Sequence, residues 1–314
     1  MKIVALAGGV GGAKLADGLA LILQPGELTV VVNTGDDFEH YGLKISPDLD
    51  TVCYTLAGIS NPATGWGREG ESWRVLAELE KLGGETWFRL GDLDLATHLE
   101  RTLRLKKGDL LTEITRDFCR KWGIRHTILP MSDDTVSTIV ITENEQLSFQ
   151  EYFVHRHFQP VVKSFVFEHI QDAKPADGVL EAIGNADMVV ICPSNPWVSI
   201  DPIVSLPGVR EVMKNVPVVA VSPIIGGTAV KGPAAKMFQE LGIVPSAFSV
   251  AEHYKDFLDG FVIDEIDAKM EEFIQAMGIR TLVTQTLMKN RNDREQLASE
   301  IMAYFIDRLV RRIC

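Results

Sequence analysis

A glycine-rich segment near the N-terminus, AGGVGGAK at residues 7–14, has the composition of a loop that binds an anion. It follows a short apolar run and precedes a segment with helical spacing, so its backbone N–H groups would lie at a helix N-terminus and favour a phosphate. Two standard nucleotide motifs do not fit. A P-loop would need Gly and Ser or Thr where Ala13 and Leu15 stand, and a dinucleotide fingerprint would need a small residue in place of Lys14. We therefore expect a nucleotide or phosphate site of another type, with an ordinary tight turn as the alternative.

Two further loops are rich in acidic residues. NTGDD at residues 33–37 follows a second apolar run, and SPDLDT at residues 46–51 stands where a helix is expected to begin. A carboxylate in such a loop can accept hydrogen bonds from sugar hydroxyls, and two carboxylates together with substrate phosphates can hold Mg²⁺. The alternatives are solvated turn residues in the first loop and helix caps in the second. The acidic residues concerned are Asp36, Asp37, Asp48 and Asp50.

Aromatic, cationic and acidic side chains occur together in WFRLGDLDLATH at residues 87–98. Trp87 and Phe88 can stack on a planar ring, and Arg89 can bind a phosphate or a ring carbonyl. The acids of this segment can cap the helix that follows. We interpret His98 as a hydrogen-bonded structural histidine rather than as a base.

Two loops of the C-terminal half have the chemistry of a nucleotide site. CPSNP at residues 192–196 follows an apolar run, and its Ser194 and Asn195 would place polar groups over the end of a strand, where an Asn suits a base or a ribose. The segment 222–234 contains glycines and Lys231, a candidate phosphate ligand. Ligands of open α/β sheets bind at the carboxyl ends of the strands. One large nucleotide-like ligand would explain why these loops and the first one share that edge.

The elements that must position these loops follow the pattern of alternating strands and helices. Residues 2–7 and 28–33 are short β-forming runs with a segment of helical spacing, 12–23, between them, which predicts a β-α-β unit. The short apolar runs at 188–192 and 216–221 are typical of buried parallel strands. We therefore predict an α/β fold with a doubly wound, mostly parallel sheet and helices on both faces.

The middle of the chain, from about residue 50 to residue 170, differs in character. It contains three helical patterns followed by two strands with hairpin spacing, and the chain shows no internal repeat and no linker between independent domains. We therefore expect one α/β domain over residues 1–314, with residues 50–170 forming an inserted α+β lobe over the active site. An amphipathic helix is expected at residues 291–312. The helical patterns are 73–81, 93–105 and 110–122, and the hairpin strands are 136–142 and 146–149.

The charge balance argues against several classes of partner. The 314 residues include 43 Asp and Glu against 31 Lys and Arg, a formal net charge of −12, so the chain lacks the basic surplus that nucleic acids and anionic membrane surfaces require. The four cysteines lie far apart and form no metal motif, so we expect neither disulfides nor zinc, and a reducing, cytoplasmic location. The N-terminus has no signal-peptide pattern, and prolines and glycines interrupt the most apolar later segments, so no membrane span is expected.

Together these motifs make the sequence similar to the 2-phospho-L-lactate transferase family, called CofD in archaea and FbiA in actinobacteria. The resemblance runs in order from residue 7 to about residue 234 and thins toward the C-terminus. It implies a step in the synthesis of the deazaflavin coenzyme F-420. A guanosine diphosphate adduct of lactate, enolpyruvate or a glycerate donates its phospho-acyl group to the ribityl hydroxyl of the deazaflavin Fo, and GMP leaves. The motifs that carry the resemblance are AGGVGGAK, NTGDD, SPDLDT, WFRLGDLDLATH, PMSDD, FQEYFV, CPSNP, SPIIGG and VKGPA.

The resemblance also implies roles for single residues, a Mg²⁺ requirement and a homodimer. Asp50 would lie at the metal and at the deazaflavin hydroxyl, and Arg89 would contact the deazaflavin. Asp36 or Asp37 is a candidate second ligand. We favour Asp50 as a metal ligand over a general base, because a carboxylate bound to Mg²⁺ is a weaker base. The residues expected along the guanosine diphosphate are Gly9, Gly11, Gly12, Lys14, Ser194, Asn195 and Lys231.

Two other functions fit parts of the pattern. Homologous bacterial regulators bind nucleotide sugars on a similar glycine-rich core without catalysis, but they are expected to lack the WFRLGD and FQEYFV segments that this chain contains. An NAD-linked oxidoreductase would fit the first β-α-β unit and Asp36 near the end of its second strand, and Lys14 in place of the third glycine counts against it. The sequence therefore favours the transferase, and the three-carbon acid stays open.

Overall fold

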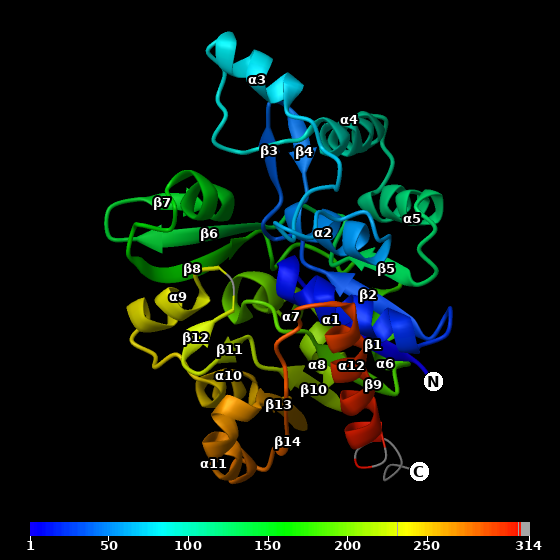
Figure 1. The fold of residues 1–314 in the computed structure, drawn as a ribbon, viewed down its shortest axis with the longest axis vertical. Helices are drawn as coiled ribbons and strands as arrows, with labels where there is room; N and C mark the ends of the chain where they lie inside the picture. Colours follow the sequence, from blue (N-terminus) through cyan, green and yellow to red (C-terminus); the bar gives the residue numbers. More distant parts are fainter. Residues whose placement is uncertain (231, 307, 309–314) are drawn as a thin grey trace.

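A seven-stranded parallel sheet forms the centre of the molecule (Figure 1). The structure is a computed structural model, and it describes residues 1–230, 232–306 and 308. Every neighbouring pair of strands in this sheet is parallel, which confirms the predicted sheet type. Across the sheet the strands are β14 (Arg280–Thr284), β13 (Gly260–Asp264), β10 (Val218–Val221), β9 (Met188–Ile191), β1 (Ile3–Ala7), β2 (Leu28–Val32) and β5 (Thr127–Pro130).

The order of the strands creates a switch point beside β1. From β1 the chain moves outward through β2 to β5, and it then returns to the other side of β1 and moves outward through β9, β10, β13 and β14. The connections that follow β1 and β9 therefore lead away from each other, and open α/β sheets bind ligands in the crevice between such connections. The glycine-rich loop follows β1 and the CPSNP loop follows β9, so both stand at this switch point.

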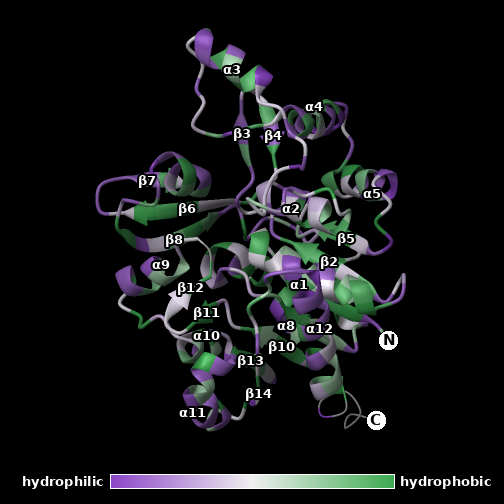
Figure 2. Cartoon of the chain, viewed as in Figure 1, coloured by the Kyte–Doolittle hydropathy of each residue, from purple (hydrophilic) through white to green (hydrophobic). Residues whose placement is uncertain are grey.

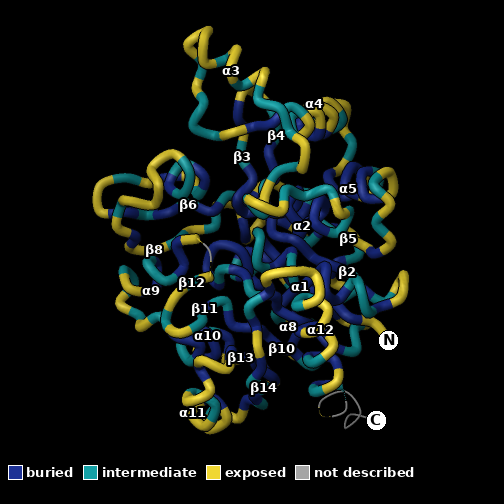
Figure 3. Tube along the Cα trace, in the orientation of Figure 1, coloured by how far each residue is buried: buried dark blue, intermediate teal, exposed yellow. Residues whose placement is uncertain are grey.

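Helices cover both faces of the sheet, as the doubly wound prediction requires. Ile3 and Ala5 of β1 pack in one apolar layer, whereas Val4 and Leu6 pack in the other, because successive strand residues point to opposite faces. The sheet is apolar and buried, and polar, exposed residues gather on the outer helices and loops (Figures 2 and 3). The first layer contains α1 (Gly9–Ile22), α2 (Pro47–Leu56), α5 (Leu111–Lys121) and α12 (Arg291–Phe305), and the second contains α6 (Val179–Gly184), α7 (Asp201–Val204), α8 (Val209–Met213), α9 (Ala234–Glu240), α10 (Ala247–Tyr254) and α11 (Glu271–Gln275).

Helix α1 packs closely against α12 because it has a glycine at the contact. A Cβ atom on Gly18 would lie 2.2 Å from the carbonyl oxygen of Arg294, so only glycine allows this approach of the two backbones. The Arg294 guanidinium also donates to the buried carboxylate of Asp17, at 3.0 Å. The helix expected at 291–312 is described from Arg291 to Phe305, and most of the remaining positions lie outside the described residues.

The segment at about 50–170 contributes to two layers of the molecule. Its strand β5 is the edge strand of the main sheet, next to β2. Its helix α5 and most of α2 pack on one face of that sheet, and the remaining elements lie above it in the view of Figure 1. The helices and the hairpin expected here are confirmed as α3, α4, α5, β6 and β7. The elements above the sheet are the hairpin β3 (Phe38–His40) and β4 (Leu43–Ile45), the helices α3 (Arg74–Lys81) and α4 (Asp92–Lys106), and an antiparallel sheet of β6 (Ser137–Thr142), β7 (Gln146–Ser148) and β8 (Val162–Glu168).

The remaining elements are short. Two are π-helical turns, η1 (Glu151–His155) and η2 (Pro196–Ile200), and such turns are frequent at functional sites. The others are the strands β11 (Ile224–Ile225) and β12 (Thr228–Ala229) and the 3₁₀ turn η3 (Glu265–Met270). Cys53, Cys119 and Cys192 are buried free thiols. Within the described residues, no helix combines the length and the apolar character that a bilayer span requires.

Candidate functional site

A cavity of about 740 Å³ lies at the carboxyl edge of the main sheet. Its walls come from segments far apart in the sequence: the loops that follow β1, β9, β10 and β14, the helices α2 and α4, and the turn η1. The volume falls in the range of small-molecule sites. The segments AGGVGGAK, SPDLDT, WFRLGD, FQEYFV, CPSNP and SPIIGG therefore all reach one cavity.

The glycine-rich loop and the CPSNP loop pack against each other at this cavity. The Ser194 hydroxyl accepts a hydrogen bond from the Gly8 N–H (3.1 Å) and donates one to the Gly8 carbonyl (2.7 Å). A Cβ atom on Gly11 would lie 2.3 Å from the Pro193 carbonyl oxygen, and one on Gly12 would lie 2.4 Å from the Ser194 hydroxyl. Ser194 and the two glycines thus allow the two loops to pack closely, and together these loops form one wall of the cavity, which we call the glycine-rich floor.

The Asp48 carboxylate lies beside the same loop. It accepts a hydrogen bond from the Asn33 amide at 3.0 Å, and a Cβ atom on Gly8 would lie 2.4 Å from its Oδ2. Gly9 has a positive φ of 58°, a conformation that favours glycine. Burial raises the pKa of Asp48 to about 6, against the lowering effect of the hydrogen bonds. A buried acidic group therefore borders the loop that is expected to hold a phosphate.

Asp36 and Asp37 are adjacent in sequence but have different surroundings. Asp36 lines the cavity and accepts a hydrogen bond from the Gln150 amide at 3.0 Å, and burial together with neighbouring carboxylates raises its pKa well above the ordinary value. Asp37 accepts a hydrogen bond from the Ser46 hydroxyl (2.7 Å) and lies 3.5 Å from the Lys44 ammonium. Burial raises the pKa of Asp37 to about 6, although Lys44 and Ser46 oppose the shift. Of the two, only Asp36 lines the cavity.

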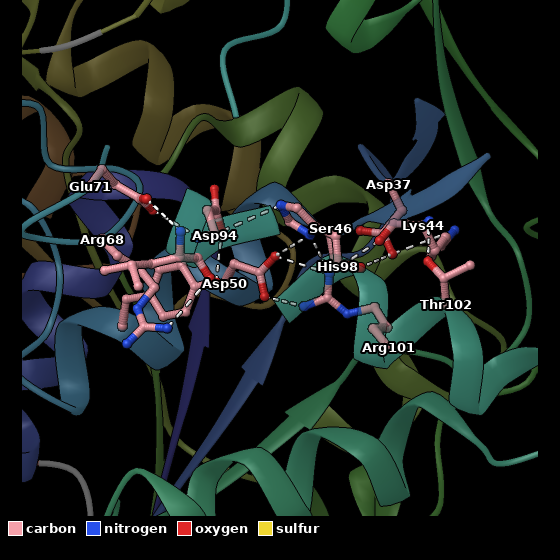
Figure 4. Close-up of polar contacts among 12 residues, drawn as sticks. Asp37, Lys44, Ser46, Asp50, Arg68, Glu71, Asp94, His98, Arg101 and Thr102 are labelled. Atoms are coloured by element: carbon pink, nitrogen blue, oxygen red, sulfur yellow. Dashed lines mark hydrogen bonds and ion pairs between the residues drawn. The ribbon is translucent and has the colours of Figure 1, made fainter. Parts of the chain in front are cut away.

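The first turn of α4 is capped by Glu71, which lies more than 20 residues earlier in the sequence. The Glu71 carboxylate accepts hydrogen bonds from the N–H groups of Leu93 (2.7 Å) and Asp94 (2.8 Å). These N–H groups have no partner within the helix, so Glu71 satisfies them. The cap fixes the place where α4 enters the site and thereby the position of Asp94 (Figure 4).

Helix α4 presents one polar face to Asp50 (Figure 4). Asp94, His98 and Arg101 follow one another at spacings of four and three residues, which places them on one side of the helix. The Arg101 guanidinium binds both carboxylate oxygens of Asp50, with 3.0 Å between Nη1 and Oδ2. Nδ1 of His98 lies 3.6 Å from Asp50 Oδ2, and Nε2 lies 3.4 Å from Asp94 Oδ1. Asp50, His98 and Arg101 are buried, so the Asp50–Arg101 pair is shielded from water.

The charges in this group stabilise one another. Burial raises the pKa of Asp50, and the adjacent Arg101 and His98 oppose that shift. Burial also disfavours the charged form of Arg101, but the Asp50 carboxylate outweighs this effect and holds the pKa of the guanidinium above its ordinary value. Burial would raise the pKa of Asp94, but His98 and the Tyr54 hydroxyl, which donates to Asp94 at 2.7 Å, hold it below the ordinary value. Because an arginine keeps its charge, the Asp50–Arg101 contact is a charged pair.

Asp50, Asp94 and His98 could hold a metal ion together. One ligand atom from each of the three lies within 4.8 Å of the others. Each oxygen of Asp50 has a lone pair besides the one that Arg101 uses, and Nε2 of His98 is buried with no hydrogen-bond partner in the described part of the chain. Mg²⁺ is usually bound by one or two carboxylates together with waters and substrate phosphates, so Asp50 and Asp94 fit it. Neither Asp36 nor Asp37 belongs to this group.

Aromatic side chains supply another wall of the cavity. Trp87, Phe149 and Phe153 line it, and the rings of Phe149 and Phe153 stack with centroids 5.5 Å apart and an angle of 9° between their planes. Arg89 also lines the cavity, with its guanidinium 4.5 Å from the centre of the Trp73 ring. Flat aromatic surfaces and a guanidinium suit a planar conjugated ring that carries polar oxygens.

Lys14 and Asn195 line the cavity while they also bind other parts of the chain. Nζ of Lys14 donates a hydrogen bond to the Met288 carbonyl at 2.8 Å. Asn195 accepts one from the Trp197 N–H at 3.1 Å and thereby caps the turn η2. Lys231 lies outside the described residues. Of the other expected residues, Gly9, Gly11, Asp36, Asp50, Arg89 and Ser194 line the cavity, whereas Gly12 and Asp37 do not.

Among the residues outside the predicted set, Tyr54, Arg101 and Gln150 donate hydrogen bonds to carboxylates of this site. The helical spacing of Asp94, His98 and Arg101 is the one signal in the sequence that could have indicated a polar face on α4. The expected structural role of His98 agrees with its burial between two carboxylates, but the same position also gives it a ligand atom for a metal. The sequence pattern carries no comparable signal for Tyr54 or Gln150.

The comparisons with known proteins agree with this geometry. The sequence model of the family described as 2-phospho-L-lactate transferase CofD matches residues 3–306. A phosphoenolpyruvate transferase from Streptomyces griseus is 43% identical over 310 residues, covering 96% of this chain and 98% of the relative. A 2-phospho-L-lactate transferase from Methanosarcina acetivorans is 43% identical over 303 residues, covering 96% of this chain and 99% of the relative.

A solved structure shares the fold at much lower identity. It is a member of the UPF0052 family from Bacillus halodurans, and it is 15% identical with a TM-score of 0.61, covering 96% of this chain and 98% of that chain. At this identity the likeness concerns the fold alone, and it agrees with the α/β architecture described above.

Proposed function

The chain belongs to the CofD family of 2-phospho-L-lactate transferases, and we propose that it transfers a phospho-lactyl or phosphoenolpyruvyl group from a guanosine diphosphate adduct to the ribityl hydroxyl of the deazaflavin Fo. The hydroxyl oxygen forms a bond to the phosphorus that carries the three-carbon acid. The bridging P–O bond of the diphosphate breaks, GMP leaves with the electron pair, and the hydroxyl proton is released. The product is a phosphodiester on the way to coenzyme F-420.

The observation that best supports this proposal is that three groups of residues, each suited to a different part of the reaction, line the same cavity. The glycine-rich floor around Gly9 and Gly11 suits a diphosphate, the aromatic wall with Arg89 suits a deazaflavin ring, and Asp50 supplies a carboxylate that suits a metal or a hydroxyl. Phosphoryl transfer depends on positioning and on neutralising charge more than on covalent help from the protein. A cavity that binds both substrates and a cation therefore meets the main requirements of the reaction.

Asp50 and Asp94 are the proposed Mg²⁺ ligands, and His98 lies between them. When bound, Mg²⁺ would neutralise charge on the diphosphate and on the leaving GMP. The backbone N–H groups of the first loop and Lys14 would hold the diphosphate, and Arg89 would orient the deazaflavin. We assign Asp36 to the wall of the nucleotide site and leave Asp37 out of the metal site, because its carboxylate binds Ser46 and Lys44.

The experiment that tests the function offers three donors to the purified chain. The lactyl, enolpyruvyl and glyceryl adducts of guanosine diphosphate are each incubated with Fo and Mg²⁺, and mass spectrometry identifies the product. Release of GMP together with a phosphodiester of Fo is the expected result. The phosphoenolpyruvate transferase and the 2-phospho-L-lactate transferase reported above are both 43% identical to this chain, so sequence identity does not indicate which acid the donor carries. The assay therefore also identifies the donor.

The alternative function is a nucleotide-sugar-binding regulator without catalysis. It predicts that the chain binds a guanine nucleotide but releases no GMP from any of the three donors. The aromatic wall formed by the WFRLGD and FQEYFV segments favours the transferase, because a nucleotide sugar has no second planar ring to place there.

We further propose that the protein is a homodimer, and light scattering on the purified chain tests this. We also propose a cytoplasmic location, in keeping with the three buried free thiols among the described residues.

A further inference from the structure

Arg101 is a charged side chain that the function has not yet used. It lies on α4 with only 2% of its side chain exposed, and a buried guanidinium is costly unless it is paired. It binds both oxygens of Asp50, and Nη1 also lies 3.3 Å from Nδ1 of His98 and 3.4 Å from the Lys44 carbonyl oxygen. Asp50 lines the cavity and Arg101 does not, so Arg101 reaches the reaction through Asp50.

This bidentate contact between Arg101 and Asp50 constrains the orientation of the Asp50 carboxylate as well as compensating its charge. An aspartate side chain turns about two single bonds, and a guanidinium that holds both oxygens fixes the plane of the carboxylate. The lone pairs of the Asp50 oxygens that do not accept from Arg101 are therefore held in a fixed direction. Because Asp50 lies in the first turn of α2 and Arg101 lies on α4, the same contact ties together the two helices that carry the proposed metal ligands.

We propose that Arg101 is a positioning residue of the transfer reaction: it holds the Asp50 carboxylate in the orientation in which Asp50 meets the metal and the acceptor hydroxyl. This inference rests on the proposed function for its substrates. A misplacement of about 1 Å at a reacting centre can reduce a rate by about a hundredfold, so a small rotation of Asp50 is enough to affect turnover.

The test uses two substitutions of Arg101 and a matched control. Arg101→Lys keeps a charge but loses the bidentate geometry, and Arg101→Met removes both. The control is Arg104→Met on the same helix, because Arg104 also binds two carboxylates, those of Asp109 (2.6 Å) and Asp117 (2.9 Å), but does not line the cavity. Thermal melts establish which variants fold, and Arg101→Lys keeps the test valid if Arg101→Met does not fold.

The expected result is a split between turnover and binding. Arg101→Lys lowers kcat by about tenfold and Arg101→Met by about a hundredfold, while the affinity for GDP and the KM for the donor stay within twofold of the parent. In an Asp50→Asn background, Arg101→Lys lowers kcat no further, because a residue that acts through Asp50 has no effect once Asp50 is changed. Equal losses in both backgrounds, or an unchanged kcat in Arg101→Lys, would overturn the proposal.

A second measurement does not depend on turnover. Mn²⁺ serves as a probe for the divalent site, and its binding is followed by electron paramagnetic resonance. Asp50→Asn should weaken Mn²⁺ binding strongly, whereas Arg101→Met should weaken it only in part, because the Asp50 carboxylate remains but loses its fixed orientation. If Arg101→Met weakens Mn²⁺ as much as Asp50→Asn does, Arg101 only maintains the fold of the site and the proposal is overturned. A parent chain that binds Mn²⁺ and GDP but converts none of the three donors would overturn the proposed function alone, and the Mn²⁺ result then decides the role of Arg101.

Discussion

The Asp48 carboxylate lies against the backbone of Gly8, so closely that a Cβ atom on Gly8 would lie 2.4 Å from Asp48 Oδ2, inside the loop that is expected to hold a diphosphate. A buried carboxylate at this place repels a phosphate when it is ionised, and with a pKa raised to about 6 by burial it is mostly ionised at neutral pH. Asp48→Asn keeps the size of the side chain and removes the charge. We expect it to bind GDP about tenfold more tightly than the parent without divalent cations, as calorimetry would measure. Asp17→Asn is the control, because Asp17 lies on α1 and pairs with Arg294. An unchanged affinity in Asp48→Asn would place the diphosphate away from Gly8.

Asp50→Asn should reduce turnover by about a hundredfold or more, because a metal ligand and a partner of the acceptor hydroxyl are both weakened. GDP binding should persist, since the glycine-rich floor does not depend on Asp50. The variant should also unfold more easily, by about 3 kcal/mol, because the buried guanidinium of Arg101 loses its charged partner. GMP release, calorimetry with GDP and a urea melt measure the three effects. Full activity would remove Asp50 from the mechanism.

Arg89→Ala should raise the KM for the deazaflavin by about tenfold and leave the KM for the guanylyl donor nearly unchanged. The reason is that Arg89 lines the cavity on the aromatic side, above the ring of Trp73. Steady-state kinetics with each substrate varied in turn measure the two constants. Arg210→Ala is a matched control, because Arg210 lies over the ring of Phe257 at 5.3 Å and does not line the cavity. The opposite pattern would move Arg89 to the nucleotide side.

Gly11→Ala should weaken GDP binding by about tenfold or more. The new Cβ atom would lie 2.3 Å from the Pro193 carbonyl oxygen, so the glycine-rich loop and the CPSNP loop must separate. Gly184→Ala is the control, because its Cβ would meet a side-chain methyl of Val212 at 3.2 Å, away from the cavity, and that side chain can move. Fluorescence titration with a labelled guanine nucleotide compares the two. Equal affinities would show that the loops tolerate separation.

Asp37 should make the protein less stable as the pH rises from about 4 to about 6. Burial raises its folded-state pKa to about 6 from an ordinary value of 3.8, so between these values the folded chain holds a proton that the unfolded chain has released. Ionisation at higher pH therefore costs the folded state about 3 kcal/mol at most. Asp37→Asn lacks this cost, so its stability relative to the parent should increase between pH 4 and pH 7 in urea melts. Asp177→Asn, at an exposed acid, should show no such trend.

Four strands of the main sheet, β1, β2, β9 and β10, could be predicted from the sequence, whereas the interior strand β13 and the edge strands β5 and β14 were not predicted. The runs at 2–7 and 188–192 become β1 and β9, whose residues are buried on both faces and therefore form continuous apolar runs. The edge strands β5 and β14 are only partly buried, and their sequences TILP and RTLVT mix polar and apolar residues without a regular alternation. Such runs are too short and too mixed to be separated from loops.

Some parts of the site could also be predicted from the sequence, and others could not. Loops at strand ends, such as the glycine-rich loop and CPSNP, could be predicted because the topology of an α/β sheet brings them to one edge. The Asp50–Arg101 pair could not be, because 51 positions separate the two residues and their contact depends on how α4 packs over α2. A local pattern indicates which side of a helix is polar, but it does not identify the residue that this side will meet.

The hydrogen bond from Lys14 to the Met288 carbonyl joins positions 274 residues apart, near the two ends of the described chain. During synthesis the glycine-rich loop leaves the ribosome long before the loop that completes its cavity. A nascent chain therefore has no closed nucleotide site until the segment around Met288 has been made. Substrates can bind and stabilise the folded protein only after that segment has left the ribosome, and the part of the chain made before it must fold without their help.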